Sequence, residues 1–176
     1  MKGAERMLTG PATIQDDAEQ IIKQYSDMVY RLAVSNMKSR SDADDVYQEV
    51  FLRYIKEIKK GAAFESDEHI KAWLIRVTIN CCKTLCTSAW FRRTTELNDN
   101  ITDEFDSFSD SGFDLHNALM KLPQKYRSII HLYYYEQYST EEIAVILEEK
   151  SSTVRTKLTR ARAKLKEILK GDYLDE

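Results

Sequence analysis

The stretch STEEIAVILEEKSSTVRTKLTRARAKLK, residues 139–166, opens with closely spaced acids and closes with closely spaced basic residues. Ser139 followed three positions later by Glu142 is a capping box, which predicts that a short helix begins there. The residues EEKSS interrupt the apolar pattern, and a second helix is expected to begin near Thr153. Two short helices joined by a tight turn, the second of them basic, are typical of a helix-turn-helix.

The second helix of this motif has one face suited to DNA. At about 100° per residue its apolar side chains share a face that we expect to pack inward, made of Val154, Leu158, Ala161, Leu165 and Ile168. The opposite face carries small and hydrogen-bonding residues with cations on both sides, namely Thr156, Thr159, Arg160 and Ala163 flanked by Arg155, Arg162, Lys157 and Lys164. Such residues can meet base edges while the cations reach phosphates. Ser152 is expected to cap the helix and to direct backbone N–H groups at a phosphate.

Glycine and proline are scarce throughout the chain. Five glycines and two prolines among 176 residues leave long uninterrupted runs over 12–60, 62–111 and 124–170. Because both residue types are costly inside helices, their scarcity predicts an all-α fold. The hydrophobic fraction of 43% and the charged fraction of 31% are those of a globular chain with one ordinary domain or two small ones.

Charge is unevenly distributed along the chain, although the net charge is only −3. Residues 94–116 carry seven acids and no lysine or arginine, whereas residues 151–170 carry seven basic residues and one acid. We therefore expect two small helical domains, at 18–93 and 115–176, joined by an acidic flexible linker at 94–114. Residues 1–17 lack apolar periodicity and are expected to form a mobile tail.

The first domain is expected to contain three helices. A helical pattern begins at Ala18, and a second helix is predicted from Ser41, where SDAD has the capping-box form, to Gly61. The third, from about Ile70 to Arg93, is apolar almost all round except for a narrow strip made of Arg76, Asn80, Lys83 and Thr87. We expect this helix to be deeply buried with its polar strip open to a partner. The alternative is a buried helix whose polar strip is only solvated.

Several functional classes are disfavoured. No run of about 18 apolar residues could span a bilayer, and the N-terminus lacks the apolar core of a secretory signal, so we expect a cytoplasmic protein. Cys81, Cys82 and Cys86 are expected to be reduced thiols, and a metal site with His69 or a redox sensor is the weaker alternative because no C-x-x-C pair occurs. Since the chain has no phosphate-binding loop or nucleophile elbow, we expect no enzyme, no cofactor and no small-molecule substrate.

These stretches together resemble the extracytoplasmic-function (ECF) group of bacterial RNA polymerase sigma factors, over about residues 18–93 and 115–170. In the first half, SDADDVYQEVFLRYIK and KAWLIRVTINCCK resemble two successive helices of that family. In the second half, LPQKYRSIIHLYYYEQYSTEEIAVIL and STVRTKLTRARAKL match its C-terminal domain. One departure is the turn of the helix-turn-helix, where Glu148 and Glu149 stand in place of the glycine and apolar residue of many relatives.

The resemblance implies a subunit that binds core RNA polymerase and directs promoter-specific initiation. It implies core polymerase as a partner, including its β subunit, with the β′ clamp helices bound by the helix that carries Asp44, Asp45, Gln48, Glu49 and Phe51. It also implies contact of melted minus-10 DNA with Arg76, Asn80 and Lys83. Candidates for minus-35 DNA are Ser152, Thr153, Arg155, Thr156, Lys157, Thr159, Arg160, Arg162 and Lys164. An anti-sigma factor, often membrane-bound, usually restrains such proteins. A stand-alone helix-turn-helix regulator is the alternative that the C-terminal segment alone allows.

Overall fold

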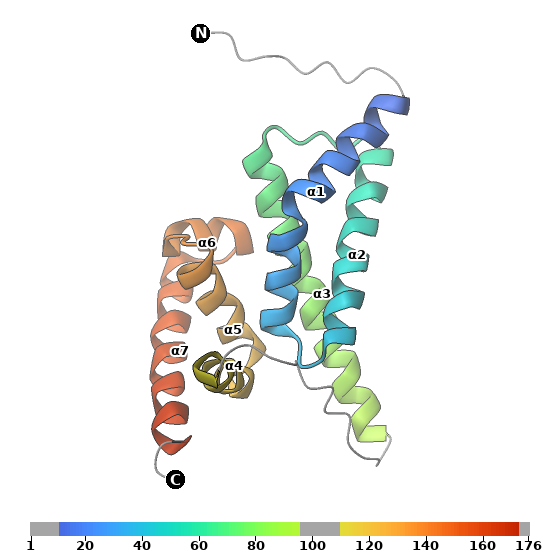
Figure 1. Cartoon of the computed structure of the whole chain (residues 1–176). Coiled ribbons are helices and arrows are strands. Elements are labelled where there is room, and N and C mark those ends of the chain that lie inside the picture. The colour runs from blue at the N-terminus through green and yellow to red at the C-terminus, as the bar shows by residue number, and fades with distance from the viewer. Residues whose placement is uncertain (1–10, 96–109, 173–176) are drawn as a thin grey trace.

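The computed structural model describes residues 11–95 and 110–172, and within these ranges the side chains of residues 18–88 and 115–171. All the regular elements in these ranges are helices, as the sequence predicts (Figure 1). They are α1 (Pro11–Asn36), α2 (Arg40–Lys59), α3 (Asp67–Thr95), α4 (Asp110–Lys121), α5 (Gln124–Ile130), the π-helical turn η1 (His131–Tyr135), α6 (Thr140–Leu147) and α7 (Ser151–Asp172).

Helices α1, α2 and α3 form an N-terminal bundle in which each helix packs against the other two. The middle of α3 is buried as predicted, since Leu74, Ile75 and Cys82 have no exposed surface. Thr78 is also fully buried, and its hydroxyl donates to the carbonyl of Leu74 at 2.7 Å, which satisfies the polar group inside the helix. This packing positions the polar strip of α3 on one edge of the bundle.

Several helices begin before the residues that the sequence predicted. The N-cap of α2 is Ser39, whose Oγ accepts from the backbone N–H of Asp42 at 3.1 Å, so the predicted cap at Ser41 is wrong. Ser39 and Asp42 have the same Ser-x-x-acid capping pattern as Ser41 and Asp44, two positions earlier. The sequence alone did not show which of the two serines caps the helix. Helix α2 ends before Gly61 as expected, and Gly61 adopts φ +86, a conformation that favours glycine.

Helices α1 and α4 begin inside segments for which no helix was expected. Helix α1 begins at Pro11, ahead of the expected start at Ala18, and proline suits a first helical position because it has no N–H to leave unpaired. Helix α4 begins at Asp110, inside the acidic segment. Residues 1–10 of the expected tail at 1–17, and residues 96–109 of the expected linker at 94–114, lie outside the described residues.

Helices α4 to α7 form a C-terminal bundle in which α5 does not end regularly. It passes into η1, where the N–H of Glu136 bonds to the carbonyl of His131 at 3.2 Å and the N–H of Tyr138 to that of Leu132 at 3.0 Å. Gln137 then adopts a positive φ of 58°, which ends the turn. Such π-helical turns are uncommon and often occur at functional sites. Here the turn places Glu136 beside the N-terminal bundle.

The predicted helix-turn-helix is formed by α6 and α7. Ser139 and Glu142 make the expected capping box, with Ser139 Oγ accepting from the N–H of Glu142 at 3.2 Å and Glu142 Oε2 accepting from the N–H of Ser139 at 2.8 Å. Helix α7 begins at Ser151, and the N–H groups of Thr153 and Val154 bond to the carbonyl of Lys150. Ser152 therefore lies inside the first turn, and its predicted role as the cap is wrong.

Buried apolar side chains of the two bundles belong to one continuous cluster. Helix α1 packs against α4 and α5, and α3 packs against α6. In the ranges that the structure describes, no helix has the length and apolarity needed to cross a membrane.

Removal of the α6 cap tests this assignment of helix ends. Ser139→Ala is expected to lower the free energy of unfolding by about 1 kcal/mol, because the N–H of Glu142 loses its acceptor. Ser152→Ala, the matched control in the first turn of α7, should change it by less than about 0.5 kcal/mol. Urea unfolding followed by circular dichroism measures both, and equal losses in the two variants would contradict the assignment.

Candidate nucleic-acid interface

The two faces of α7 are separated as the sequence predicts. Val154, Leu158 and Ala161 are buried, with exposed fractions of 4% or less, and α7 packs through this side against α5 and α6. The opposite face is open to solvent and carries Thr156, Thr159, Arg160, Ala163 and Lys164. Leu165 and Ile168, also expected inside, are half-buried because α7 extends past α6. The exposed face offers hydrogen-bonding groups and cations along one side of a helix that can enter a DNA groove.

Acids of the helix-turn-helix hold two cations of α7. Arg155 donates to Glu141 at 3.0 Å and to Ser151 Oγ at 3.2 Å, and Lys157 donates to both carboxylate oxygens of Glu149 at 2.6 Å. The Arg155 pair is exposed on both sides, so solvent screens it and DNA can displace it at little cost. The Lys157 pair is about three-quarters buried and makes the tighter contact.

The remaining cations of α7 differ in how they are held. Arg162 donates from Nε to the hydroxyl of Tyr134 at 2.8 Å, and its guanidinium lies 5.2 Å and 5.5 Å from the ring centres of Tyr133 and Tyr134. This arrangement fixes Arg162 against η1. Within the described residues, no ion-pair or hydrogen-bond partner is seen for the side chains of Arg160 and Lys164. Both side chains therefore face solvent and can contact a phosphate or a base edge.

The polar strip of α3 is open along most of its length. Asn80, Lys83 and Thr87 are exposed. Arg76 is more enclosed, with 31% of its side chain exposed, and its guanidinium forms an ion pair with Glu148 in the turn between α6 and α7. The strip thus lies beside the helix-turn-helix, and one side chain joins the two surfaces.

The surface of α2 carries most of the residues expected to contact polymerase. Asp44, Asp45 and Gln48 are exposed, whereas Glu49 is half-buried and accepts from Arg53 Nε at 2.6 Å. Phe51 is only 5% exposed and packs edge-on against Tyr47, so it supports this face from behind and does not stand on it. Leu52, which sequence reasoning did not single out, is 50% exposed on this helix.

The buried guanidinium of Arg127 joins the two bundles, and sequence reasoning assigned it no such role. It donates to the carbonyl of Asn36 at 2.7 Å, to that of Leu122 at 2.6 Å and to that of Met120 at 3.2 Å. Asn36 is the last residue of α1, and Met120 and Leu122 flank the end of α4. Because the last carbonyls of a helix lack intrahelical partners and carry partial negative charge, one cation caps two helices from different bundles.

Side-chain contacts around Asn36 complete this joint, which we define as Asn36, Gln124, Arg127 and Ser128. The amide oxygen of Asn36 accepts from Ser128 Oγ at 2.6 Å and from Gln124 Nε2 at 3.3 Å. The amide nitrogen of Asn36 donates to the carbonyl of Leu32 at 2.8 Å. Asn36 is fully buried and Ser128 nearly so, and among the described residues Arg127 Nε lacks a hydrogen-bond partner. The joint is therefore polar, and one donor in it is unsatisfied.

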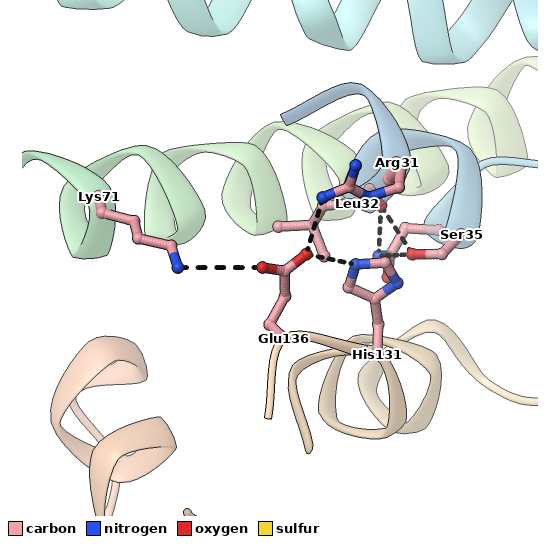
Figure 2. Close-up of polar contacts among 7 residues, drawn as sticks. Arg31, Leu32, Ser35, Lys71, His131 and Glu136 are labelled. Carbon is pink, nitrogen blue, oxygen red and sulfur yellow. Dashed lines mark hydrogen bonds and ion pairs between the residues drawn. The ribbon is translucent and has the colours of Figure 1, made fainter. Parts of the chain in front are cut away.

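Glu136 lies between the bundles and is surrounded by cations. Figure 2 shows its carboxylate between Arg31 of α1 and Lys71 of α3, beside the imidazole of His131. The ion-pair distances are 3.6 Å to Arg31, 4.0 Å to Lys71 and 3.6 Å to His131, longer than good hydrogen bonds. The polar contact with His131 holds the pKa of Glu136 below its ordinary value against the opposing effect of burial, and the charges of His131, Lys71 and Arg31 lower it further.

The cysteines show no arrangement suited to metal. Cys81 and Cys82 are buried, Cys86 is half-buried, and all three are free thiols. Burial raises the pKa of Cys82 far above its ordinary value, so this thiol is protonated and unreactive at neutral pH. Among the described residues no group of three histidine, cysteine or acidic side chains could hold a metal ion.

Comparison with protein-family models gives two matches in order along the chain. Residues 21–92 match the model described as Sigma-70 region 2, and residues 113–165 match the model described as Sigma-70, region 4. The first match covers most of α1, all of α2 and α3 up to residue 92, and the second begins inside α4 and extends to Leu165 of α7. The two matched segments thus correspond to the two bundles.

Characterised proteins and solved structures of the same kind are similar to this chain. The RNA polymerase sigma factor SigV of Bacillus subtilis is 33% identical over 138 residues, which cover 75% of this chain and 78% of that protein. The ECF RNA polymerase sigma factor SigE of Mycolicibacterium smegmatis is 29% identical over 92% of this chain and 65% of its own length. The sigma factor RpoE of Bartonella quintana, solved with the anti-sigma factor NepR, has a TM-score of 0.69 at 21% identity over 88% of this chain and 97% of that chain. CnrH, solved with the cytosolic domain of CnrY, has a TM-score of 0.64 at 24% identity over 90% of each chain.

The lowered pKa of Glu136 predicts a stability effect that depends on pH. Glu136→Gln is expected to lower the free energy of unfolding by about 1–2 kcal/mol at pH 7, because the cations around it lose their anion. A depressed folded-state pKa stabilises the fold above the unfolded value of 4.5, and that stabilisation is lost as pH falls through the folded value. The difference between wild type and variant should therefore shrink below pH 4.5. Denaturant unfolding from pH 3.5 to pH 7 measures it.

Glu57→Gln is the matched control, because Glu57 pairs with Lys60 on the exposed surface of α2. It should change stability by less than about 0.5 kcal/mol at every pH. A Glu136→Gln effect that stays constant down to pH 3.5 would show that the charge of Glu136 is not what stabilises the contact.

Proposed function

This chain belongs to the ECF group of RNA polymerase sigma factors, and we propose which of its surfaces perform each step of that function. As a sigma factor it binds core RNA polymerase and directs promoter-specific initiation, and it is not an enzyme by itself. The observation that carries the assignment is the match to region 2 followed by region 4, in the order and on the bundles just described. A stand-alone helix-turn-helix regulator is not favoured, because it would not account for the region 2 match.

The N-terminal bundle is proposed to contact polymerase and the minus-10 element. The exposed acids Asp44 and Asp45 with Gln48 offer hydrogen-bond acceptors and negative charge toward the β′ clamp helices, with Glu49 at the edge of this face and Phe51 supporting it. The α3 strip of Arg76, Asn80 and Lys83 is proposed to bind the melted strand. Arginine and lysine can contact its phosphates, and the asparagine amide can pair with an unstacked base.

The C-terminal bundle is proposed to read the minus-35 element with α7. Arg160 faces solvent beside Thr156 and Thr159, whose hydroxyls donate to the carbonyls of Ser152 and Arg155 and keep lone pairs for a base edge. Arg155 and Lys157 are proposed to exchange Glu141 and Glu149 for phosphates on binding. Lys164 and Arg162 contribute charge along the same groove, while Ser152 and Thr153 lie at the helix start, near a phosphate.

Regulation by an anti-sigma factor is proposed from the structural neighbours. RpoE of Bartonella quintana was solved with the anti-sigma factor NepR, and CnrH with the cytosolic domain of CnrY. We propose that this chain acts in the cytoplasm and is restrained there by a comparable anti-sigma factor. A membrane-spanning segment in that anti-sigma factor would hold the complex at the membrane. Co-purification with a candidate regulator, and its inhibition of transcription, would test this part.

Transcription in vitro tests the function as a whole. Purified chain added to core RNA polymerase should direct initiation from specific sites on genomic DNA fragments, and core polymerase alone should not. A gel shift on duplex DNA with and without core enzyme distinguishes a sigma factor from a stand-alone helix-turn-helix regulator. Tight and specific duplex binding by the chain alone, with no complex formed on core polymerase, would overturn the assignment.

Two substitutions in α7 test the proposed groove orientation. Arg160→Ala is expected to weaken binding to cognate minus-35 DNA by about 1–3 kcal/mol and to leave scrambled DNA nearly unaffected, because it removes a base contact. Lys164→Ala, the matched control, should weaken both DNAs equally and reduce the salt dependence by about one counterion. Binding of the polymerase complex at several salt concentrations measures both, and equal losses on the two DNAs for Arg160→Ala would contradict the orientation.

A further inference from the structure

The guanidinium of Arg162 lies against two tyrosine rings of η1. The rings of Tyr133 and Tyr134 stand nearly at right angles, with an interplanar angle of 78° and 5.0 Å between their centres. The guanidinium carbon lies 5.2 Å from the first ring centre and 5.5 Å from the second, within the range of a cation–π contact. The hydroxyl of Tyr134 accepts from Arg162 Nε at 2.8 Å. The rings and the hydroxyl together restrict the orientation of the guanidinium.

These contacts leave Arg162 accessible at the edge of the open face of α7. The tyrosines reach α7 because η1 continues α5, and α5 packs along α7. Arg162 follows the buried Ala161 and lies one turn after Thr159 on the solvent side of the helix. Its side chain is exposed, and that of Tyr134 is 53% exposed. A ligand in solvent can therefore reach the guanidinium without displacing the tyrosines.

The partners of Arg162 are neutral, unlike those of two other cations on α7. Arg155 pairs with Glu141. Lys157 pairs with Glu149. Each of these cations must leave a carboxylate before it can contact a phosphate. Within the residues that the structure describes, the contacts of Arg162 are with tyrosine, so its positive charge is not compensated by an acid. Arg162 is thus fixed in orientation while it keeps its charge.

A fixed and uncompensated guanidinium is suited to a phosphate. Its planar N–H donors match two oxygens of a phosphate group, and with Nε bonded to Tyr134 the two terminal nitrogens remain free to donate. A long arginine side chain loses rotamer freedom when it binds a ligand. Because the tyrosines have already restricted Arg162 in the free chain, less freedom is lost on binding.

We propose that Tyr134 is a positioning residue, which holds Arg162 in the orientation that donates to a phosphate of the minus-35 duplex. Tyr134 acts through Arg162 and does not itself contact the DNA. Since the ligand is a phosphate, the effect of Tyr134 does not depend on the base sequence. The inference rests on the proposed binding of α7 to the minus-35 element.

Removal of one hydroxyl group tests this role. Tyr134→Phe keeps the ring and removes the acceptor of Arg162 Nε. The polymerase complex of the full chain should then bind promoter DNA about two- to ten-fold more weakly, the range of one hydrogen bond, on cognate and scrambled minus-35 sequences alike. The dependence of affinity on salt should stay the same, because Arg162 keeps its charge.

Tyr135→Phe is the matched control, since Tyr135 is 59% exposed in the same turn and its ring stacks on His131. It should bind promoter DNA as wild type does. DNA that ends before the minus-35 element gives a second control, on which Tyr134→Phe should also match wild type. An equal loss on this shorter DNA would place the effect in polymerase binding or in folding, and would overturn the proposal.

A double variant separates positioning from a direct contact with DNA. Arg162→Ala should weaken binding and lower the salt dependence by about one counterion. Tyr134→Phe added to Arg162→Ala should cause no further loss, because the group that it positions is already absent. A further loss as large as that seen with Arg162 present would mean that the hydroxyl of Tyr134 contacts DNA itself, which contradicts a positioning role.

The outcomes distinguish this inference from the proposed function. If Arg162→Ala binds promoter DNA as wild type does, the proposed placement of Arg162 in the minus-35 groove is wrong, and the role of Tyr134 falls with it. If Arg162→Ala weakens binding while Tyr134→Phe and Tyr135→Phe behave alike, the placement stands and only the positioning role is overturned.

Discussion

The arrangement of the two bundles depends on a buried cation that has helix ends for partners. The guanidinium of Arg127 is 5% exposed and donates to carbonyls at the ends of α1 and α4. A buried charge is costly unless hydrogen-bonded, and a helix C-terminus supplies both free acceptors and partial negative charge. These carbonyls bring the end of α1 against the C-terminal bundle. Burial lowers the pKa of Arg127, but an arginine stays protonated at any physiological pH.

The position of this joint determines which other side chains of the two bundles meet. With the end of α1 held by Arg127, Glu136 comes between Arg31 and Lys71, and the turn of the helix-turn-helix comes beside the polar strip of α3. The ion pairs outside the joint accompany an apolar cluster that both bundles share, and an exposed pair such as Arg76–Glu148 contributes little to stability. These ion pairs matter because they occupy cations that are proposed to bind DNA. The acids that open the segment 139–166 hold Arg155, Lys157 and Arg76 in the free chain, and polyanionic DNA can take their place.

Sequence reasoning predicted the parts of the molecule that have local signals. The capping box at Ser139 and the buried face of α7 depend on residues at most four positions apart, and both predictions are confirmed. The all-α class followed from the scarcity of glycine and proline. The predicted cap at Ser152 is wrong because helix α7 begins at Ser151, and Ser39 displaced Ser41 because the same capping pattern occurs twice.

The contacts between bundles could not be predicted because their partners are far apart in sequence. Asn36 and Ser128 are separated by 92 positions, and Arg76 and Glu148 by 72, with no periodicity to link them. Arg127 and Ser128 stand out only as polar residues in an otherwise apolar stretch, which did not indicate a partner. The π-helical turn that delivers Glu136 likewise has no marker in the residues His131–Tyr135. The roles of individual side chains toward polymerase and DNA remain predictions.

The central claim is that the hydrogen bond from the buried guanidinium of Arg127 to the carbonyl of Asn36 holds the two bundles together in the free chain. Fluorescent labels attached through non-cysteine chemistry at Lys23 of α1 and Glu167 of α7, both exposed, report the separation of the bundles. Single-molecule energy transfer should be uniformly high in the wild-type chain and lower in Arg127→Ala, which loses the hydrogen bond to the carbonyl of Asn36. The same transfer efficiency in wild type and Arg127→Ala, or a low value in wild type, would contradict the account.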